Sequence, residues 1–408
     1  MKNFKHFSTL FISILLIFSG CTVETNTNQQ SGQITSGSSD SGSSSEEDSK
    51  TSGPIIKTEK QTVTFSNTDA NFTMIDISFN DGRTSDSIIL GEDLLEVPYT
   101  TNVKPFRLAM YETSYNTWYE VLKWAESNGY TIVNKGAEGM YGGPGAEACM
   151  NPNGEGAEPK LVEMPVCRLT WRDVMVWCNA LSEMKGLEPV YCTDKDFKTP
   201  LRDSTGVALN DLKNYKIKPG EVDNPYVNTN ANGFRLPYVK EWEYAARKRL
   251  DGTAISGRNV SGDETGSAIE TTATEQMNGL SFPLSTKQNE YCWQRQNSAS
   301  DGPSETFTGQ DDTTTTLSAK TGKSISGRRM HLSGGKLPNH LGFFDMSGNV
   351  PEWCFDYDVT YGSVYKFSTA RGLRGGDHLN EIVGSRCSGN KGGALVGLAF
   401  GFRIAQNH

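Results

Sequence analysis

The sequence predicts an α+β domain in which long ordered loops surround a modest twisted sheet. Only two segments of the folded part have the spacing of a well-formed amphipathic helix, and one segment alternates polar and apolar residues as a half-buried strand or hairpin does. The remainder is rich in turn formers, with 42 glycines among 408 residues. Short elements joined by long loops are typical of this fold class.

The first 20 residues are predicted to be a secretion signal rather than part of the fold. A basic start (Lys2, Lys5) precedes an apolar run at residues 10–18, which is too short to span a bilayer. Small residues at 19 and 20 precede Cys21, the pattern that is cut in bacterial lipoproteins, so we predict lipidation of Cys21. The alternative is an ordinary signal peptide followed by an incidental cysteine.

Residues 21–54 are predicted to form a lipidated cysteine and a disordered tether. Val23 and Ile34 are the only sizeable apolar side chains between residues 22 and 53, which is too little to offset the entropy lost on folding. A lipid anchor with a flexible tether predicts a lipid-anchored protein of the bacterial outer membrane or cell surface. Residues 55–408 are then long enough to form a single domain.

Charge and cysteine content exclude two classes of function. The net charge is −9 and no basic cluster is present, which argues against nucleic-acid binding. Of the 8 cysteines, an odd number remains beyond Cys21, so at least one is expected to be free. No CxxC or Cys/His spacing indicates a zinc site.

The first predicted elements are a strand or hairpin over residues 62–79 and a helix within residues 111–130. Thr113 or Ser114 is suited to cap the helix, and Gly129 is suited to end it. Its apolar face is expected to carry Trp118, Val121, Leu122 and Ala125.

A second helix is predicted within residues 167–191. Thr170 and Asp173 have the spacing of a capping box, and Gly186 is suited to end the helix. Its apolar side is expected to carry Val174, Cys178 and Leu181. A turn, an extended segment broken at Pro237 and a shorter helix with Trp242, Ala245 and Ala246 are expected over residues 231–249. Residues 251–335 are expected to be mostly loop.

Six phrases carry a family resemblance. They are YETSYNTWYEVLKWA, WRDVMVWCNALSEMKGLEPVY, GFRLPYVKEWEYAAR, LGFFDMSGNVPEWCFD, RGLRGGDH and GFRIA. In this order they resemble the formylglycine-generating-enzyme-type sulfatase-modifying domain. The resemblance implies a variant of the C-type lectin-like fold, with a small antiparallel sheet, two main helices and much irregular loop.

The family includes an oxidase that uses a pair of copper-binding cysteines. The resemblance places Asn380 and Ser385 at those two positions, and neither side chain supplies a thiolate ligand. Cys387 is near but solitary. We therefore predict a protein that is not an enzyme and has no redox cofactor. The alternative is a formylglycine-generating-type oxidase or a related metal-dependent modifying enzyme with another metal site.

The phrase DMSGNVPE resembles a calcium-binding turn of the family. The resemblance implies that the carboxylates of Asp345 and Glu352 and the carbonyls of Gly348 and Val350 surround one structural Ca²⁺ ion, which selects hard oxygen ligands. The alternative is a metal-free turn in which the two carboxylates make structural hydrogen bonds.

The C-terminal segment, residues 371–405, has an unusual composition. Between residues 377 and 400 only Glu381 and Lys391 fall outside the set that NNC codons encode. Some members of the resembled family are variable proteins of diversity-generating retroelements, in which such codons are rewritten near the C-terminus. Arg374 and Arg403 are then expected to be framework residues that bond to loop carbonyls, and glycines 375 and 376 to adopt unusual backbone angles.

The resemblance to these variable proteins predicts a ligand-contact surface on the segment. We expect it to consist of Asp377, His378, Leu379, Asn380, Val383, Ser385, Cys387, Asn390, Leu395, Val396 and Leu398. For the apolar members, and above all for Val396 and Leu398, core packing is the alternative.

The leading hypothesis is a surface-anchored, non-catalytic ligand-binding protein whose C-terminal segment is diversified to alter ligand specificity. Its partner is an unknown variable ligand, a protein or a glycan on another cell, and not nucleic acid. Two alternatives stay open: the oxidase described above, and a structural envelope module without specific binding.

Overall fold

The structure is a computed structural model of the chain. It describes residues 55–91, 98–139, 155–160, 163–206, 218–264, 286–295, 297–298, 330–357, 371–378, 385–389 and 400–408, with the backbone of the short strands at 274–277, 280–283, 304–308, 314–318 and 396–397. By its contacts the chain divides into two units, Met1–Thr51 and Ser52–His408. Every described helix and strand belongs to Ser52–His408.

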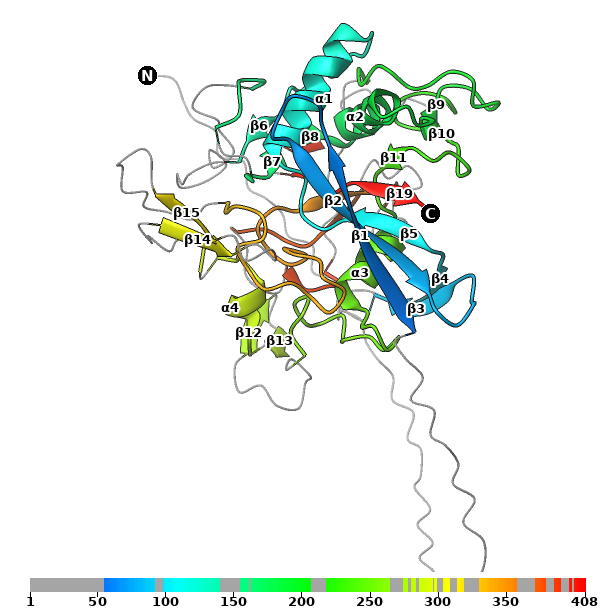
Figure 1. The fold of residues 1–408 in the computed structure, drawn as a ribbon. Coiled ribbons are helices and arrows are strands. Elements are labelled where there is room, and N and C mark those ends of the chain that lie inside the picture. Colours follow the sequence, from blue (N-terminus) through cyan, green and yellow to red (C-terminus); the bar gives the residue numbers. More distant parts are fainter. Residues whose placement is uncertain are drawn as a thin grey trace, which may run out of the picture. The chain divides into compact units, whose positions relative to one another are not determined.

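The core of this unit is a five-stranded antiparallel sheet (Figure 1). Its strands, in spatial order, are β1 (Ile56–Thr64), β2 (Asn71–Phe79), β5 (Phe106–Ala109), β19 (Ala405–Asn407) and β11 (Phe234–Arg235). The hairpin predicted within residues 62–79 is therefore confirmed as part of β1 and β2. The C-terminal strand β19 lies between β5 and β11, which places the end of the chain within the sheet.

Both faces of the sheet are buried. Phe72 and Met74 of β2 belong to an apolar cluster with helices α1 (Tyr115–Ser127) and α2 (Trp171–Met184). Ile75 and Ile77 point the other way and belong to a second cluster with α3 (Val239–Arg247). Figure 1 shows α1 and α2 together at the top and α3 in the lower centre. The alternation along β2 thus divides the core in two.

The helices begin and end where the sequence predicts. Ser114 caps α1, and the predicted face of Trp118, Val121, Leu122 and Ala125 is buried. A capping box of Thr170 and Asp173 begins α2. The third predicted helix is confirmed as α3. Glycines 129 and 186 follow the ends of α1 and α2 with positive φ angles of 77° and 70°, a conformation that glycine adopts without steric cost.

The start of α2 yields a stability prediction. The Thr170 hydroxyl accepts a hydrogen bond from the Asp173 backbone N–H at 3.2 Å and donates to the Asp173 carboxylate at 2.5 Å. The replacement Thr170→Val keeps the shape and removes both bonds, so we expect a loss of about 1 to 2 kcal/mol in the free energy of unfolding. Urea denaturation measures it.

Thr62→Val on exposed β1 is the matched control, because its hydroxyl bonds only to the exposed Thr73 hydroxyl. It is expected to change the free energy of unfolding by less than about 0.5 kcal/mol. Equal losses in the two variants would contradict a capping role for Thr170.

The remaining elements are short. Two-stranded antiparallel sheets pair β3 (Asp86–Leu90) with β4 (Tyr99–Val103), β6 (Ala137–Glu138) with β7 (Val166–Cys167), β8 (Leu169–Thr170) with β18 (Val396–Gly397), β9 (Tyr191–Cys192) with β10 (Tyr226–Val227), β12 (Thr274–Met277) with β13 (Leu280–Pro283), β14 (Ser304–Thr308) with β15 (Thr314–Ser318), and β16 (Glu352–Tyr357) with β17 (Arg371–Arg374). The span 251–335, expected to be mostly loop, contains two of these hairpins and the one-turn helix α4 (Gln288–Tyr291).

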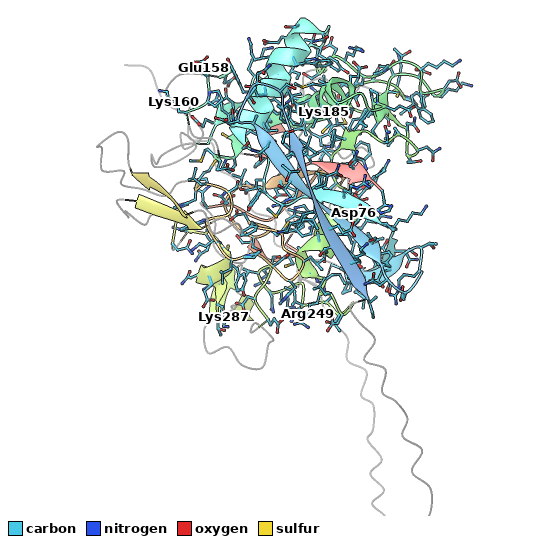
Figure 2. All side chains as sticks on the ribbon, in the orientation of Figure 1. Asp76, Glu158, Lys160, Lys185, Arg249 and Lys287 are labelled. Carbon is cyan, nitrogen blue, oxygen red and sulfur yellow. The ribbon has the colours of Figure 1, made fainter. Side chains whose placement is uncertain are left out.

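Ion pairs at the sheet surface are accessible to solvent. Asp76 of β2, labelled in Figure 2, accepts a bond from the Arg107 Nε atom of β5 at 2.8 Å.

In the part of the chain that the structure describes, no helix has the length and apolar character needed to cross a bilayer.

The described cysteines are all buried and none forms a disulfide. They are Cys167, Cys178, Cys192, Cys292, Cys354 and Cys387. The interpretation of Cys178 as a buried thiol is confirmed, and its burial raises its pKa well above the ordinary value. Cys149 and Cys21 lie outside the described residues.

Candidate functional site

Two buried arginines frame the C-terminal segment. Arg403 is fully buried and donates to the carbonyls of Ala109, Met110 and Phe344 at 3.0, 3.1 and 2.9 Å. Its Nη2 and Nε atoms also bond to the two oxygens of Glu352 at 2.6 and 2.8 Å. The prediction that Arg403 bonds to loop carbonyls is confirmed, and the ion pair with Glu352 is an additional contact.

Arg374 ties the other end of the segment to α3. Its Nη1 atom lies 3.5 Å from the Ser388 carbonyl oxygen, and its Nη2 atom lies 3.8 Å from the Glu243 carboxylate. Glu243 also accepts bonds from Arg247 and from the Ser388 hydroxyl. The buried carboxylate of Glu243 thus connects residues 374 and 388 to α3.

The two glycines after Arg374 turn the chain inward. Gly375 and Gly376 have φ angles of 90° and 73°, as predicted. The carbonyl of Gly375 accepts a bond from the Gly348 N–H at 2.7 Å, which joins the segment to the turn at residues 345–352.

His378 lies inside this junction. Its backbone N–H donates to the Asn349 carbonyl at 3.1 Å, and its Nδ1 atom lies 2.9 Å from the same oxygen. Since a carbonyl oxygen only accepts, Nδ1 carries the proton of this bond. The His378 carbonyl accepts a bond from the Ser298 hydroxyl at 2.7 Å. The side chain, 1% exposed, serves as a structural anchor here.

Residues 385–389 are also interior. Backbone N–H groups of Cys387 and Ser388 donate to the carbonyls of Asn259 and Gly257 at 3.0 and 2.9 Å. Ser385 is fully buried beside the Cys292 thiol. Burial raises the pKa of both the Cys292 and the Cys387 thiols to about 12, so both are protonated and unreactive at neutral pH.

These positions correct part of the predicted contact surface. The structure buries His378, Ser385 and Cys387, because hydrogen bonds from loops distant in sequence hold this part of the chain against α3 and the 345–352 turn. Asp377 is partly exposed. Val396 lies in β18, paired with Thr170, and its side chain is not described. The other predicted contact residues lie outside the described residues: Leu379, Asn380, Val383, Asn390, Leu395 and Leu398.

The turn predicted to bind calcium is held by other contacts. Asp345 has a φ angle of 52°, and its Oδ2 atom accepts the Gly334 N–H at 2.5 Å. Glu352 is fully buried, with both oxygens bonded to Arg403 and one of them also to the Trp242 indole N–H at 2.7 Å. A Cβ atom on Gly348 would lie 2.0 Å from the Trp293 carbonyl oxygen, which explains glycine there without an ion.

The four predicted ligands do not fit a calcium ion in this arrangement. One of the two carboxylates is already neutralised by the Arg403 guanidinium, which leaves Asp345 as the remaining charged ligand with the Gly348 and Val350 carbonyls. Calcium is usually held by six to eight oxygen ligands. Among the described side chains, no group of three or more His, Cys, Asp or Glu residues is placed to hold a metal.

Glu112 is a member of this cluster that the sequence did not indicate. Its carboxylate accepts bonds from the Val350 N–H at 3.1 Å, the Asn349 amide at 2.7 Å and the Ser333 hydroxyl at 2.9 Å. Burial and the nearby charges of Asp345 and Glu352 raise the pKa of Glu112 well above its ordinary value. Glu112 precedes α1 and lies outside any periodic pattern, so no sequence signal identified it.

A stacked Trp–His pair borders the segment and was also missed. The Trp293 indole stacks on the His331 imidazole with ring centroids 3.6 Å apart, and the Lys336 ammonium lies 3.7 Å from the Trp293 ring centroid. The Trp293 carbonyl accepts the Asn349 N–H at 2.9 Å. These residues lie in or beside the span expected to be loop, and none follows a helical or strand period.

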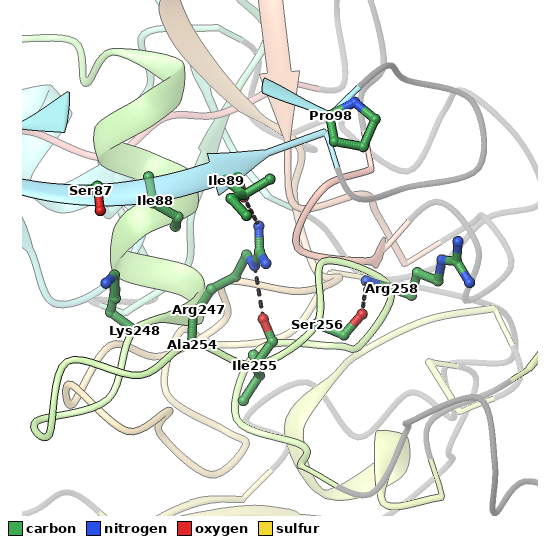
Figure 3. Close-up of a pocket in the computed structure, with 10 residues that line it drawn as sticks. All are labelled: Ser87, Ile88, Ile89, Pro98, Arg247, Lys248, Ala254, Ile255, Ser256 and Arg258. Carbon is green, nitrogen blue, oxygen red and sulfur yellow. Dashed lines mark hydrogen bonds between the residues drawn. The ribbon is translucent and has the colours of Figure 1, made fainter. Parts of the chain in front are cut away.

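A separate cavity of about 600 Å³ lies between β3 and the loop after α3. Arg247 lines it, and Figure 3 shows its bonds to the carbonyls of Ile89 and Ile255, at 2.6 and 3.0 Å. Lys248 pairs with Asp86 at 2.7 Å. Arg247 and Lys248 are thus bound within the protein, and Arg258 is a third cation that lines the cavity.

Comparisons with known proteins agree with this architecture. The model of the sulfatase-modifying factor enzyme 1-like domain matches residues 77–408. Chaperone protein LppX of Paenibacillus barcinonensis is 31% identical over 211 residues, 51% of this chain and 55% of that protein. This chain therefore spans about half the length of that curated relative.

Two solved structures are similar to this chain. Variable protein 1 of Treponema denticola is 21% identical, with a TM-score of 0.52 over 86% of this chain and 99% of that one. CarF is 20% identical, with a TM-score of 0.47 over 79% and 97% of the two chains. The likeness to the Treponema protein confirms the predicted C-type lectin-like α+β fold class.

Proposed function

We propose that this chain, which belongs to the sulfatase-modifying factor enzyme 1-like domain family, is a non-catalytic, lipid-anchored binding protein of the cell surface. In this proposal the segment between Arg374 and Arg403 carries the ligand-contact residues and is diversified by a retroelement. The ligand is a protein or a glycan on another cell.

The observation that carries the non-catalytic part is the environment of Ser385. The family resemblance places one of the oxidase cysteines at this position, and a hydroxyl cannot replace a thiolate in copper binding. The thiols nearby are no substitute, because burial raises the pKa of Cys292 and of Cys387 to about 12. Neither forms the thiolate that such chemistry needs at neutral pH.

The framework around the segment supports the binding part. Arg374, Arg403 and the two glycines fix its ends. The described residues between them are held to neighbouring loops by backbone hydrogen bonds as well as by side-chain contacts. A segment held at both ends on a rigid base tolerates substitution of its outward side chains without a core penalty. The relative with a similar fold is itself named a variable protein.

Deep sequencing of the gene's 3′ end across a growing culture and related isolates tests the proposal. We expect substitutions confined to adenine positions between the codons for Arg374 and Arg403. Codon 377 should vary more freely than codons 378, 385 and 387, since the latter three side chains are at most 1% exposed. An invariant segment would overturn diversification.

The oxidase alternative is tested separately. The purified chain, loaded with Cu(I), is incubated with oxygen and a cysteine-containing peptide, and oxygen uptake and peptide mass are recorded. No turnover is expected. Formation of an aldehyde from the peptide cysteine would overturn the non-catalytic assignment.

A further inference from the structure

The described residues also form an open cleft larger than the cavity beside β3, and Gly372 and Arg374 are the described residues of the 371–405 segment that line it. Its volume is about 1140 Å³, and it runs between β4, the first turn of α3, the β16–β17 pair and the last two residues of the chain. None of the described side chains between residues 377 and 400 lines it. We call it the Tyr238 cleft. Its volume is slightly above the 300 to 1,000 Å³ that is usual for small-molecule sites.

The Tyr238 ring is a rigid aromatic wall of the cleft. It packs edge-on against Phe355, with ring centroids 5.7 Å apart and an interplanar angle of 85°. The Arg235 guanidinium lies 5.0 Å from the ring centroid and is itself fixed by two 2.7 Å bonds to Glu241. Tyr99, 43% exposed, lines the same cleft. Two phenol rings therefore offer apolar surface with polar edges.

Asp356 adds a carboxylate acceptor beside Tyr238. Its Oδ2 atom accepts the Val239 N–H at 2.6 Å, which leaves Oδ1 as the second acceptor on the cleft side. Burial and the neighbouring Glu241 charge raise the pKa of Asp356, while Lys240 and Arg371 oppose the rise. A hydrogen-bond donor that reaches this carboxylate would compensate its desolvation.

The other polar groups of the cleft supply donors. Lys240 donates to the Asn102 carbonyl at 3.1 Å and so retains further N–H bonds, and Lys104 is exposed at the rim. The amides of Asn102 and Asn230 both donate and accept. The Arg235–Glu241 pair is internally neutral. A ligand here must therefore donate to Asp356 and accept from lysine and amide groups.

We infer that the Tyr238 cleft binds a neutral, hydroxyl-rich ligand, a short oligosaccharide, by stacking a sugar ring on Tyr238 and hydrogen-bonding its hydroxyls to Asp356 and the rim. A hydroxyl group is the donor and acceptor that this mixture of groups requires. A simple anion would face Asp356, and a simple cation would face Lys104 and Lys240 as well as Arg374, whose guanidinium lies 3.8 Å from the Glu243 carboxylate. Because none of the described side chains of residues 377–400 lines the site, we expect sugar binding not to depend on the diversification of that segment.

Isothermal titration calorimetry of the full chain in detergent tests this, with maltotriose, cellotriose and chitotriose as probes. At least one trisaccharide is expected to bind. Tyr238→Ala and Asp356→Asn should each weaken binding about tenfold or more, which corresponds to about 1.4 kcal/mol. Asp356→Asn retains an acceptor for the Val239 N–H, so the start of α3 is preserved.

Controls separate this site from the rest of the molecule. Ser256→Ala, at the other cavity, should leave trisaccharide binding unchanged, and so should exchange of residues 377–400 for another variant sequence. Loss of binding on that exchange would assign the sugar to the variable segment and overturn the inference. So would failure of all three sugars to bind. If Tyr238→Ala does not fold, Asn102→Ala at the rim replaces it, with a smaller expected loss.

Discussion

Replacing Arg403 by methionine is expected to lower the free energy of unfolding by about 3 to 5 kcal/mol. The guanidinium is fully buried and supplies the positive charge that faces Glu352, with Glu112 and Asp345 close by. Its removal leaves a buried carboxylate without a counter-ion and takes one donor from each of three carbonyls, of which Met110 keeps the Phe344 N–H at 3.0 Å. Urea denaturation followed by tryptophan fluorescence measures the loss.

Two further variants identify the cause. Arg107→Met removes a partly exposed pair with Asp76 and should cost less than about 1 kcal/mol. Adding Glu352→Gln to Arg403→Met should recover part of the loss, because the uncompensated charge is then gone. If the double variant is no more stable than Arg403→Met, the effect comes from lost packing and carbonyl bonds rather than from the ion pair.

Replacing Asp345 by asparagine is expected to stabilise the protein above pH 6. Burial raises the pKa of Asp345 from its ordinary 3.8 to about 6. The folded state therefore binds the Asp345 proton more tightly than the unfolded state does. This tighter binding contributes fully to the stability of the folded state below pH 3.8, and the contribution is lost as the pH rises through 6. A difference of this size corresponds to about 3 kcal/mol at neutral pH.

Asparagine removes the charge and keeps an oxygen that accepts the Gly334 N–H. It also tolerates the φ angle of 52° at this position. Thermal unfolding of both proteins from about pH 4 to 8 should show a stability that falls with pH in the original chain and changes less in Asp345→Asn. Asp345→Ala, which lacks the acceptor, should be less stable than both at the acidic end of this range.

The same measurements examine the calcium prediction. Calcium at millimolar concentration is expected to leave the melting temperature of the original chain unchanged. A rise with calcium that disappears in Asp345→Asn would instead show that an ion, rather than a proton, compensates the buried charge of this cluster.

Local features of the fold could be predicted from the sequence. The capping box of Thr170 and Asp173, the buried stripe of α1 and the glycines after both helices depend on residues within a few positions of one another. The order of the family phrases likewise predicted the fold class. Hydrogen-bond caps and apolar periods are local physical requirements, so they can be read without knowledge of the tertiary structure.

The site depended on contacts that no local pattern encodes. His378, Ser385 and Cys387 are buried by groups at Asn259, Ser298 and Asn349, which are distant from them in sequence. Glu112 lies near Asp345 and Glu352 only in the folded chain. Arg403 donates hydrogen bonds to both oxygens of Glu352, the carboxylate that the sequence predicted as a calcium ligand. The sequence by itself determined the main helices, the first hairpin and the family. The tertiary structure decided which side chains of a glycine-rich segment face inward and which charges compensate one another, because burial and charge pairing depend on distances in space rather than along the chain.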